Sequence, residues 1–191
     1  MSLEGQIRQE RLAAYHRLRG GFPIPLAGAT WWAALALAGY CGAPQRLWIF
    51  AAVYGSGLIF PLALLFARIF RCDFMKDRSA VASVLAPTFI SMLLFWPIAI
   101  SAWWAYPALF PLVLAIGLSL HWPVIGWSYG KTGIYTAHAV VRAAVCFYIW
   151  NWLPEARLTL LPAAVAVVYL ATVLVILVDS ARRPGYLAVP A

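Results

Sequence analysis

The side chains most able to do chemistry lie in one stretch of this sequence. His121 ends an apolar run, and after a short turn four polar residues follow at spacings of four, three and four, namely Lys131, Tyr135, His138 and Arg142. In an α-helix these spacings place the four side chains on one face. A guanidinium and imidazoles without a carboxylate suit the binding of an anion or a polar solute. We therefore predict a ligand-binding site formed by His121, Tyr135, His138 and Arg142.

A structural role for the same residues is the alternative. A charged side chain near the middle of a membrane costs about 3 kcal/mol on insertion scales, so it needs a hydrogen-bond acceptor. None of the six acidic residues falls inside an apolar stretch. Arg142 must then bond to backbone carbonyls, hydroxyl groups, water or an anion. If its partners belong to the protein, the polar stripe serves helix packing.

The turn before the stripe predicts a second and simpler anion site. Lys131 and Thr132 follow Gly130 at the start of an expected helix, where free N–H groups favour an anion such as a lipid headgroup. A nucleotide-binding loop is excluded. Its glycines need four residues between them, whereas Gly126 and Gly130 are separated by three.

The sequence does not indicate an enzyme or a metal centre. His121 and His138 have no third residue beside them that could complete a metal site. No paired carboxylates, nucleophile–base pair or zinc-protease motif is present either. The three cysteines are Cys41, Cys72 and Cys146, which are too far apart in sequence for a metal-binding motif. We expect no metal and no cofactor, and we place Cys72 in an intracellular loop.

The elements that must position these residues are membrane helices. The 191-residue chain is 64% hydrophobic and 10% charged, with a mean hydropathy of +0.84, whereas a soluble domain carries about 25% charged residues. The apolar runs are continuous, which is typical of helices, and about 20 residues cross a bilayer. The sequence therefore predicts an all-α, polytopic membrane bundle with six transmembrane helices, over residues 22–42, 47–70, 80–104, 107–126, 132–152 and 158–178.

Basic residues set the predicted orientation. With the N-terminus inside, eleven of the fourteen Lys and Arg residues fall in inner segments, and two fall in outer loops. The positive-inside rule then places both termini in the cytoplasm and the protein in the inner membrane. The net charge of +8 reflects this topology and attraction to anionic inner-leaflet lipids, with no nucleic-acid partner. Aromatic residues Trp122, Trp127 and Tyr129 are expected at the inner interface.

The two ends of the chain are predicted to lie outside the bilayer. Residues 1–21 form a basic amphipathic helix on the inner leaflet, because Leu3, Ile7, Ala14 and Leu18 share a helical face among arginines. Residues 179–191 form a cytoplasmic tail. Within the spans, prolines predict kinks, at Pro61, Pro87, Pro97, Pro111, Pro123 and Pro162.

Two segments carry a resemblance to a known family. They are "LIFPLALLFARIFRCDF" and the stretch from "FPLVLAIGLSL" through "HWPVIGWSYGKTGIY". The chain resembles a family of small bacterial integral membrane proteins of unknown function over about residues 22 to 178. The resemblance implies a compact helical bundle in a bacterial inner membrane and supplies no activity or catalytic residue. The matching positions are Phe60, Pro61, Asp73, His121, Pro123, Trp127 and Tyr129.

These observations favour a transporter or channel-like protein for a small polar or anionic solute. The alternative is a non-transporting accessory or structural membrane protein. The expected surroundings are the lipid bilayer and its anionic inner-leaflet lipids, and the sequence also allows a homo-oligomer.

Overall fold

The chain is helical throughout the part that the structure describes. The computed structural model describes residues 2–72, 74, 77 and 79–182. Asp73, one of the positions that carry the family resemblance, and most of the expected C-terminal tail, residues 183–191, lie outside the described residues. The α-helices are α1 (Leu3–Arg17), α2 (Pro23–Tyr40), α3 (Gln45–Ser56), α4 (Ile59–Ile69), α5 (Ala80–Leu93), α6 (Trp96–Ala105), α7 (Phe110–Gly117), α8 (Trp122–Ser128), α9 (Thr132–Trp152) and α10 (Leu160–Ala181).

Five helical stretches in the described part are long and apolar enough to cross a membrane. The bent pair α3–α4 makes a sixth when it is counted as one span, with 53° between its two helices. The predicted span over residues 132–152 coincides with α9, and the others agree in position to within a few residues. The five stretches are Arg19–Tyr40, Ser83–Ala105, Pro107–Ser128, Thr132–Trp152 and Leu160–Ala181.

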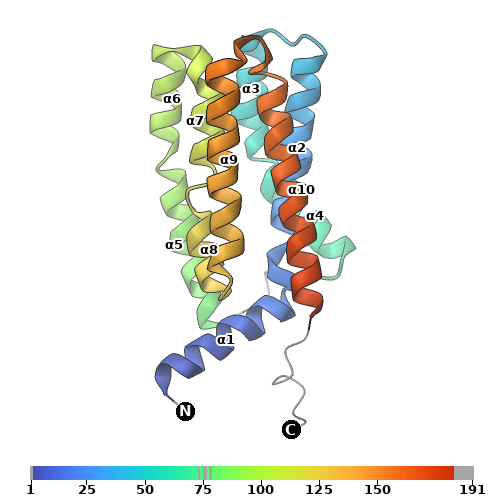
Figure 1. Ribbon diagram of the computed structural model, residues 1–191, viewed down its shortest axis with the longest axis vertical. Helices are drawn as coiled ribbons and strands as arrows, with labels where there is room; N and C mark the ends of the chain where they lie inside the picture. Colours follow the sequence, from blue (N-terminus) through green and yellow to red (C-terminus); the bar gives the residue numbers. More distant parts are fainter. Residues whose placement is uncertain (1, 73, 75–76, 78, 183–191) are drawn as a thin grey trace.

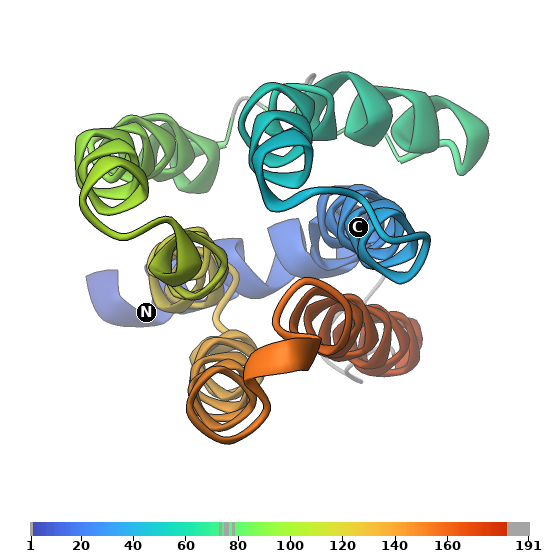
Figure 2. The ribbon, with the colours of Figure 1, turned by 90° about the horizontal axis from the view of Figure 1, so that it is seen from above.

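Seen from above, the bundle has three rows (Figure 2). Helices α9 and α10 form one row, α2 and the α7–α8 span form the middle row, and the α3–α4 and α5–α6 spans form the third. Helix α2 packs on α10 and α4, while α9 packs on α10, α8 and α7. The third row is attached to the middle one, since α5 packs on α8 and α6 packs on α7.

Three consecutive spans are broken near their middle. The breaks lie between α3 and α4, between α5 and α6, and between α7 and α8. In each case the second helix carries a proline in its first turn, namely Pro61, Pro97 and Pro123. At such positions the missing N–H has no acceptor within the helix in any case, so proline is well tolerated. Most of the expected proline kinks are therefore helix starts. Pro87 is the exception, because it lies inside α5.

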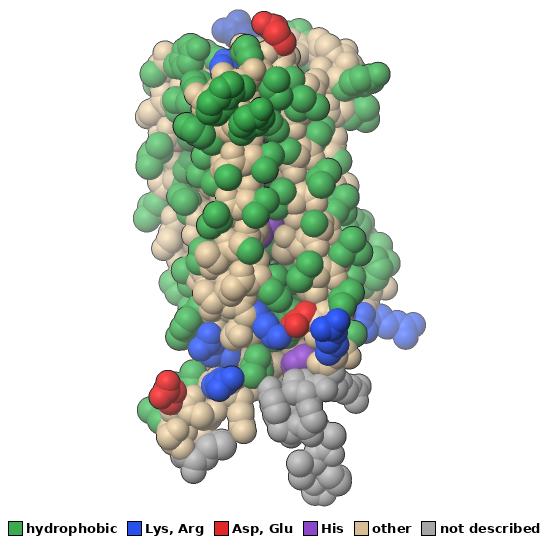
Figure 3. Space-filling model, in the orientation of Figure 1, with side chains coloured by type: hydrophobic (Ala, Val, Ile, Leu, Met, Phe, Trp, Pro, Cys, Tyr) green, Lys and Arg blue, Asp and Glu red, His purple; other side chains and the backbone are tan. Residues whose placement is uncertain are grey.

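Helix α1 crosses the end of the bundle at which α10 ends (Figure 1). Ala14 and Tyr15 are buried, and the Tyr15 hydroxyl donates a hydrogen bond to the Ile176 carbonyl at 3.4 Å. Of the four positions of the predicted apolar face, Ala14 and Leu18 are buried, whereas Leu3 and Ile7 are exposed. Lys and Arg side chains gather at this end, below a largely uncharged band (Figure 3). The two ends of the described chain therefore lie on one side, and the assignment of that side to the cytoplasm stays a prediction.

Candidate functional site

The polar stripe on α9 faces the interior of the bundle, as the residue spacing predicts. Tyr135, His138 and Arg142 are all buried, whereas neighbours on the opposite face, such as Val140 and Val141, are exposed. The Tyr135 hydroxyl donates a hydrogen bond of 2.6 Å to the Gly20 carbonyl. Gly20 has a positive φ of 59°, and a Cβ there would meet the Ile176 side chain at 2.6 Å. Tyr135 thus ties α9 to the turn that follows α1.

His138 bonds to α10 and stacks on α8. Its Nδ1 lies 2.8 Å from the Thr172 hydroxyl oxygen, and that hydroxyl donates to the Val168 carbonyl at 2.8 Å. Because the hydroxyl has one proton, Nδ1 is the donor in the first bond and Nε2 is left as an acceptor. The imidazole stacks on the Trp122 ring at 3.8 Å between centroids. Among the described residues, Nε2 has no hydrogen-bond partner.

Arg142 is the largest polar side chain in the core, with 0% of its surface exposed. Its Nη1 donates a hydrogen bond of 2.9 Å to the Tyr169 hydroxyl. The guanidinium carbon lies 5.2 Å from the centre of the Trp32 ring and 5.0 Å from that of Tyr169. These contacts are cation–π interactions, which stabilise a desolvated cation by about 2 kcal/mol. In the described part of the chain, Nε and Nη2 have no hydrogen-bond partner.

Among the described residues, no carboxylate forms an ion pair with Arg142. The ion pairs between described residues include Arg17–Asp77 and Lys131–Asp179, and both of these lie at the α1 end of the bundle. Of the acceptors expected from the sequence, the structure shows a hydroxyl group, that of Tyr169. Burying a guanidinium with a single hydrogen bond lowers the stability of the fold unless a further acceptor approaches the group.

Lys131 and Thr132 lie at the α1 end of α9. Thr132 is the first residue of the helix, and Lys131 precedes it. The Lys131 ammonium pairs with the Asp179 carboxylate at 2.6 Å and lies 5.1 Å from the centre of the Tyr15 ring. The lysine therefore links the start of α9 to the end of α10 and to α1. Binding of a lipid headgroup at this position stays a prediction.

His121 immediately precedes α8. It lies close to Trp122 but apart from the polar stripe of α9. Its ring is 5.8 Å from that of Phe89 and 6.3 Å from that of Trp122, measured between centroids. Its Nδ1 is buried without a hydrogen-bond partner among the described residues. Trp122 therefore lies next to both histidines, since it also stacks on His138.

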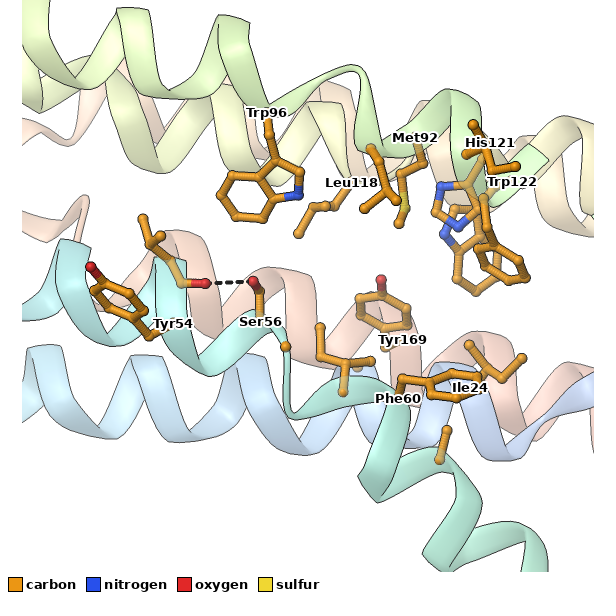
Figure 4. A pocket seen from close by; sticks show the side chains of 18 of the residues that line it. Ile24, Tyr54, Ser56, Phe60, Met92, Trp96, Leu118, His121, Trp122 and Tyr169 are labelled. Carbon is orange, nitrogen blue, oxygen red and sulfur yellow. Dashed lines mark hydrogen bonds between the residues drawn. The ribbon is translucent and has the colours of Figure 1, made fainter. Parts of the chain in front are cut away.

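A cavity of about 760 Å³ opens next to this group (Figure 4). It lies between the α3–α4 and α5–α6 spans, and its remaining wall comes from α2, α8 and α10. Its lining includes residues at all three helix breaks, among them Gly57, Trp96 and Leu118. The wall is mostly apolar. Its side chains with polar atoms are those of His121, Trp122, Trp96, Tyr169, Tyr54 and Ser56.

The wall of the cavity separates His121 from the other predicted site residues. Trp122 and Tyr169 line the cavity on one side. On the other side, Trp122 stacks on His138 and Tyr169 bonds to Arg142. The structure thus brings His138 and Arg142 together behind two aromatic side chains, with His121 in front of them. Tyr135 lies farther toward α1, in contact with Trp122 and Tyr129.

Several members of this group were not predicted from the sequence. Trp122 and Tyr129, which the sequence predicts at the inner membrane interface, are buried inside the bundle, whereas Trp127 is exposed; the depth of these residues in the membrane stays a prediction. Tyr169 and Thr172 were overlooked. They are the polar residues of the apolar run from Leu160 to Val178, and their spacing of three places them on one helical face. Two polar residues on one face of an otherwise apolar helix were the signal in the sequence that could have identified them.

Comparison with known proteins identifies a family. A model of a family of unknown function, DUF7010, matches residues 7–179. The chain belongs to this family. The match covers more of the chain than the resemblance over residues 22 to 178 suggested, and it includes most of α1. No curated protein and no solved structure matches the chain. The bacterial inner-membrane location implied by the resemblance stays a prediction.

Proposed function

We propose that this member of DUF7010 is a membrane transporter that binds its substrate in the cavity between the α3–α4 and α5–α6 spans. The observation that carries the proposal is the position of the cavity. It is lined by residues at the breaks of three consecutive spans. In transporters, substrate sites commonly lie near the bilayer midplane where membrane helices are discontinuous.

The breaks give the cavity walls a means of movement. Half-helices joined by short non-helical links can rotate against one another, which a continuous helix resists. The α3–α4 span is bent by 53° at Gly57 and Leu58. At the second break Phe95 packs on α7, so closely that a Cβ on Gly117 would lie 2.0 Å from the Phe95 ring. Movement of one broken span would therefore be transmitted to the next.

The composition of the wall indicates the kind of substrate. The cavity volume of about 760 Å³ is that of a site for one small molecule. Its walls are mostly apolar, and the polar atoms near one end belong to His121, Trp122 and Tyr169. We propose a largely apolar molecule with a hydrogen-bonding group, in place of the small polar solute that the sequence alone favours.

The non-transporting alternative is favoured by a different observation. Arg142 is fully buried, bonded to Tyr169 and enclosed by aromatic rings, which is what a helix-packing role requires. In that case the stripe joins α9 to α10 and the protein acts through partners. Access to the cavity distinguishes the two functions, because a packing protein has no need to open it.

Substrate binding is tested with 1-aminoanthracene, an apolar fluorescent molecule with one amino group, added to the protein in nanodiscs. We expect saturable binding to the wild type. Met92→Trp places a large side chain in the cavity and should weaken binding by about tenfold or more. Leu94→Trp is the matched control, because Leu94 is exposed on the bundle surface and does not line the cavity. Equal effects of the two variants would contradict the proposed site.

Transport is tested by access from both sides of the membrane. In a Cys41→Ser background, Met92→Cys should react with an impermeant maleimide applied outside and, in a separate sample, with the same reagent applied inside. Leu94→Cys, which faces lipid, should react from neither side. Labelling of Met92→Cys from one side only, or from neither, would contradict transport and favour the accessory function.

A further inference from the structure

An uncompensated positive charge lies directly behind the cavity wall. Arg142 is fully buried, and its guanidinium contacts the Trp32 ring and the Tyr169 side chain. No described carboxylate forms an ion pair with it. Of these two neighbours, Tyr169 also lines the cavity, whereas Trp32 does not. The guanidinium is thus separated from the cavity by one tyrosine.

The hydrogen bond to Tyr169 leaves a particular edge of the guanidinium unused. Nη1 is the nitrogen bonded to the Tyr169 hydroxyl, and Nε and Nη2 are without a hydrogen-bond partner in the described structure. The N–H groups of Nε and Nη2 on that edge are parallel, and together they form the fork that holds a carboxylate through two hydrogen bonds. Tyr169 therefore orients the guanidinium and leaves its carboxylate-binding edge unpaired among the described residues, enclosed by neighbouring side chains.

Other unused donors and small residues lie near the same place. The Trp32 Nε1 and Trp122 Nε1 atoms are buried and have no hydrogen-bond partner among the described residues. Gly28, which lines the cavity, leaves room for the tyrosine ring, since a Cβ there would lie 2.9 Å from the Tyr169 Cζ. The Tyr169 hydroxyl is directed toward the opposite wall of the cavity, which carries Met92 and Leu118 (Figure 4).

We infer that the substrate is an amphiphilic anion, a single-chain carboxylate whose apolar body fills the cavity and whose headgroup reaches Arg142 beside Tyr169. This inference rests on the proposed function. The apolar walls match the chain, and the buried guanidinium gains a counter-charge that no described carboxylate supplies through an ion pair. Anionic phospholipid offers similar chemistry, but the cavity has the volume of a site for one small ligand. We therefore assign the single-chain molecule.

The test compares palmitate with its neutral analogue 1-hexadecanol, at pH 8 in nanodiscs of zwitterionic lipid. Each is measured by its displacement of 1-aminoanthracene. We expect the wild type to bind palmitate at least about tenfold more tightly than the alcohol. Arg142→Gln should bind both equally, and Arg142→Lys, which keeps the charge without the fork, should retain part of the preference. Tyr169→Phe should keep the preference, because it leaves the Nε and Nη2 edge intact.

Arg157→Gln is the matched control. Arg157 lies at the far end of the bundle, where its Nε donates to the Trp150 carbonyl at 2.8 Å and its guanidinium lies over the Trp150 ring. Its loss should leave the preference for palmitate unchanged. If Arg142→Gln fails to fold, the wild-type comparison and Arg142→Lys still decide the inference.

Each contrary result has a distinct meaning. If the wild type binds palmitate and hexadecanol equally, or if Arg142→Gln keeps the preference, the anionic headgroup assignment is overturned and the proposed function stands. If neither molecule displaces a probe that still binds saturably, the single-chain assignment is overturned and the proposed function stands; if the probe itself does not bind saturably, the proposed cavity function fails. If anionic phospholipid added to the nanodisc abolishes palmitate binding by the wild type and by Arg157→Gln alike, whereas both bind palmitate in zwitterionic nanodiscs, the anion is a bilayer headgroup and the single-chain assignment is overturned.

Discussion

The Tyr169 hydroxyl accepts a hydrogen bond of 2.9 Å from Nη1 of Arg142, across the interface of α9 with α10, the most apolar of the five long helical stretches in the described part of the chain. The bond joins α9 to α10, and on α10 it is followed three residues later by Thr172, which bonds to His138. The two long helices are therefore held together by a pair of polar contacts among apolar side chains. In apolar surroundings, removing one partner of a hydrogen bond destabilises a protein more than removing both, because the remaining polar group is left buried without a partner.

Removing the hydrogen-bond acceptor, Tyr169, is expected to destabilise the protein more than removing the charged side chain, Arg142. Tyr169→Phe leaves the guanidinium buried without its hydrogen bond and should lower the free energy of unfolding by about 2–3 kcal/mol. Arg142→Leu removes a burial cost of about 3 kcal/mol and leaves a neutral hydroxyl unpaired, at about 1–3 kcal/mol. Its stability should therefore stay within about 1–2 kcal/mol of the wild type. Unfolding in mixed micelles measures both values.

The double variant is the control for that pair. Arg142→Leu combined with Tyr169→Phe should be more stable than Arg142→Leu alone by about 1–3 kcal/mol, because the second change then removes a buried unpaired hydroxyl. If Arg142→Leu unfolds the bundle while Tyr169→Phe does not, the guanidinium is held by interactions other than the bond to Tyr169.

Gly117 is predicted to control the packing of the second helix break. A Cβ at this position would lie 2.0 Å from the Phe95 ring, whereas a Cβ on Gly133 would meet nothing within 4 Å. Gly117→Ala should lower the free energy of unfolding by about 1–3 kcal/mol, because Phe95 must move. Gly133→Ala, in the first turn of α9, should leave it unchanged or raise it by up to about 1 kcal/mol. Thermal unfolding of the two variants gives the comparison, and equal effects would contradict the close contact.

The contact between α1 and the loop after α4 is predicted to depend on pH only in acid. Arg17 Nη2 pairs with the Asp77 carboxylate at 2.8 Å. Burial acts to raise the pKa of Asp77, but hydrogen bonds from Ser79 and Arg17 outweigh it and hold the pKa below its ordinary value. A lowered pKa means that the ion pair contributes above the ordinary pKa and is lost as pH falls through the folded-state value. The protection of the α1 amides from hydrogen exchange, relative to their intrinsic rates at each pH, should thus be constant near neutral pH and fall only below about pH 4.

Asp77→Asn should reproduce the acid state at neutral pH. Arg17 is half exposed, so the pair contributes at most about 1 kcal/mol, and exchange of α1 should rise roughly two- to fivefold. Glu4→Gln, in the exposed first turn of the same helix, is the control and should have no such effect. If α1 instead begins to lose its protection from exchange near neutral pH, a titrating group other than Asp77 attaches α1 to the bundle.

Native thiols test the predicted orientation. Cys41 is exposed at the end of α2, opposite α1, and an impermeant maleimide should label it in intact spheroplasts. Cys72 is buried, and its thiol donates a hydrogen bond to the Leu18 carbonyl at 3.1 Å. Cys72 should therefore react with maleimide at least about tenfold more slowly than Cys41, even after the membrane is permeabilised. The sequence alone predicts a loop thiol that the reagent can reach.

A reporter at the other end completes this experiment. Ser2 is the exposed N-cap of α1. In a Cys41→Ser background, Ser2→Cys should react only after the membrane is permeabilised. Labelling of Ser2→Cys from outside, with Cys41 protected, would place both termini outside the cell.

The sequence alone determined the helical class, the positions of the apolar spans and the inward face of α9. These features depend on local information. A run of about 20 apolar residues is long enough to cross a bilayer, and spacings of three and four residues define a helix face regardless of its neighbours. For the same reason Tyr135, His138 and Arg142 could be placed on one buried face before their partners were known.

Only the tertiary structure decided what that face meets. Tyr169 lies in the last span, 27 residues after Arg142, and nothing local to either residue specifies their contact. Trp122 has the sequence environment of an interfacial tryptophan, but α8 turns it inward onto His138. The cavity likewise depends on how three broken spans pack against α2 and α10. These relationships are set by the packing of helices distant in sequence, which periodicity and hydropathy do not encode.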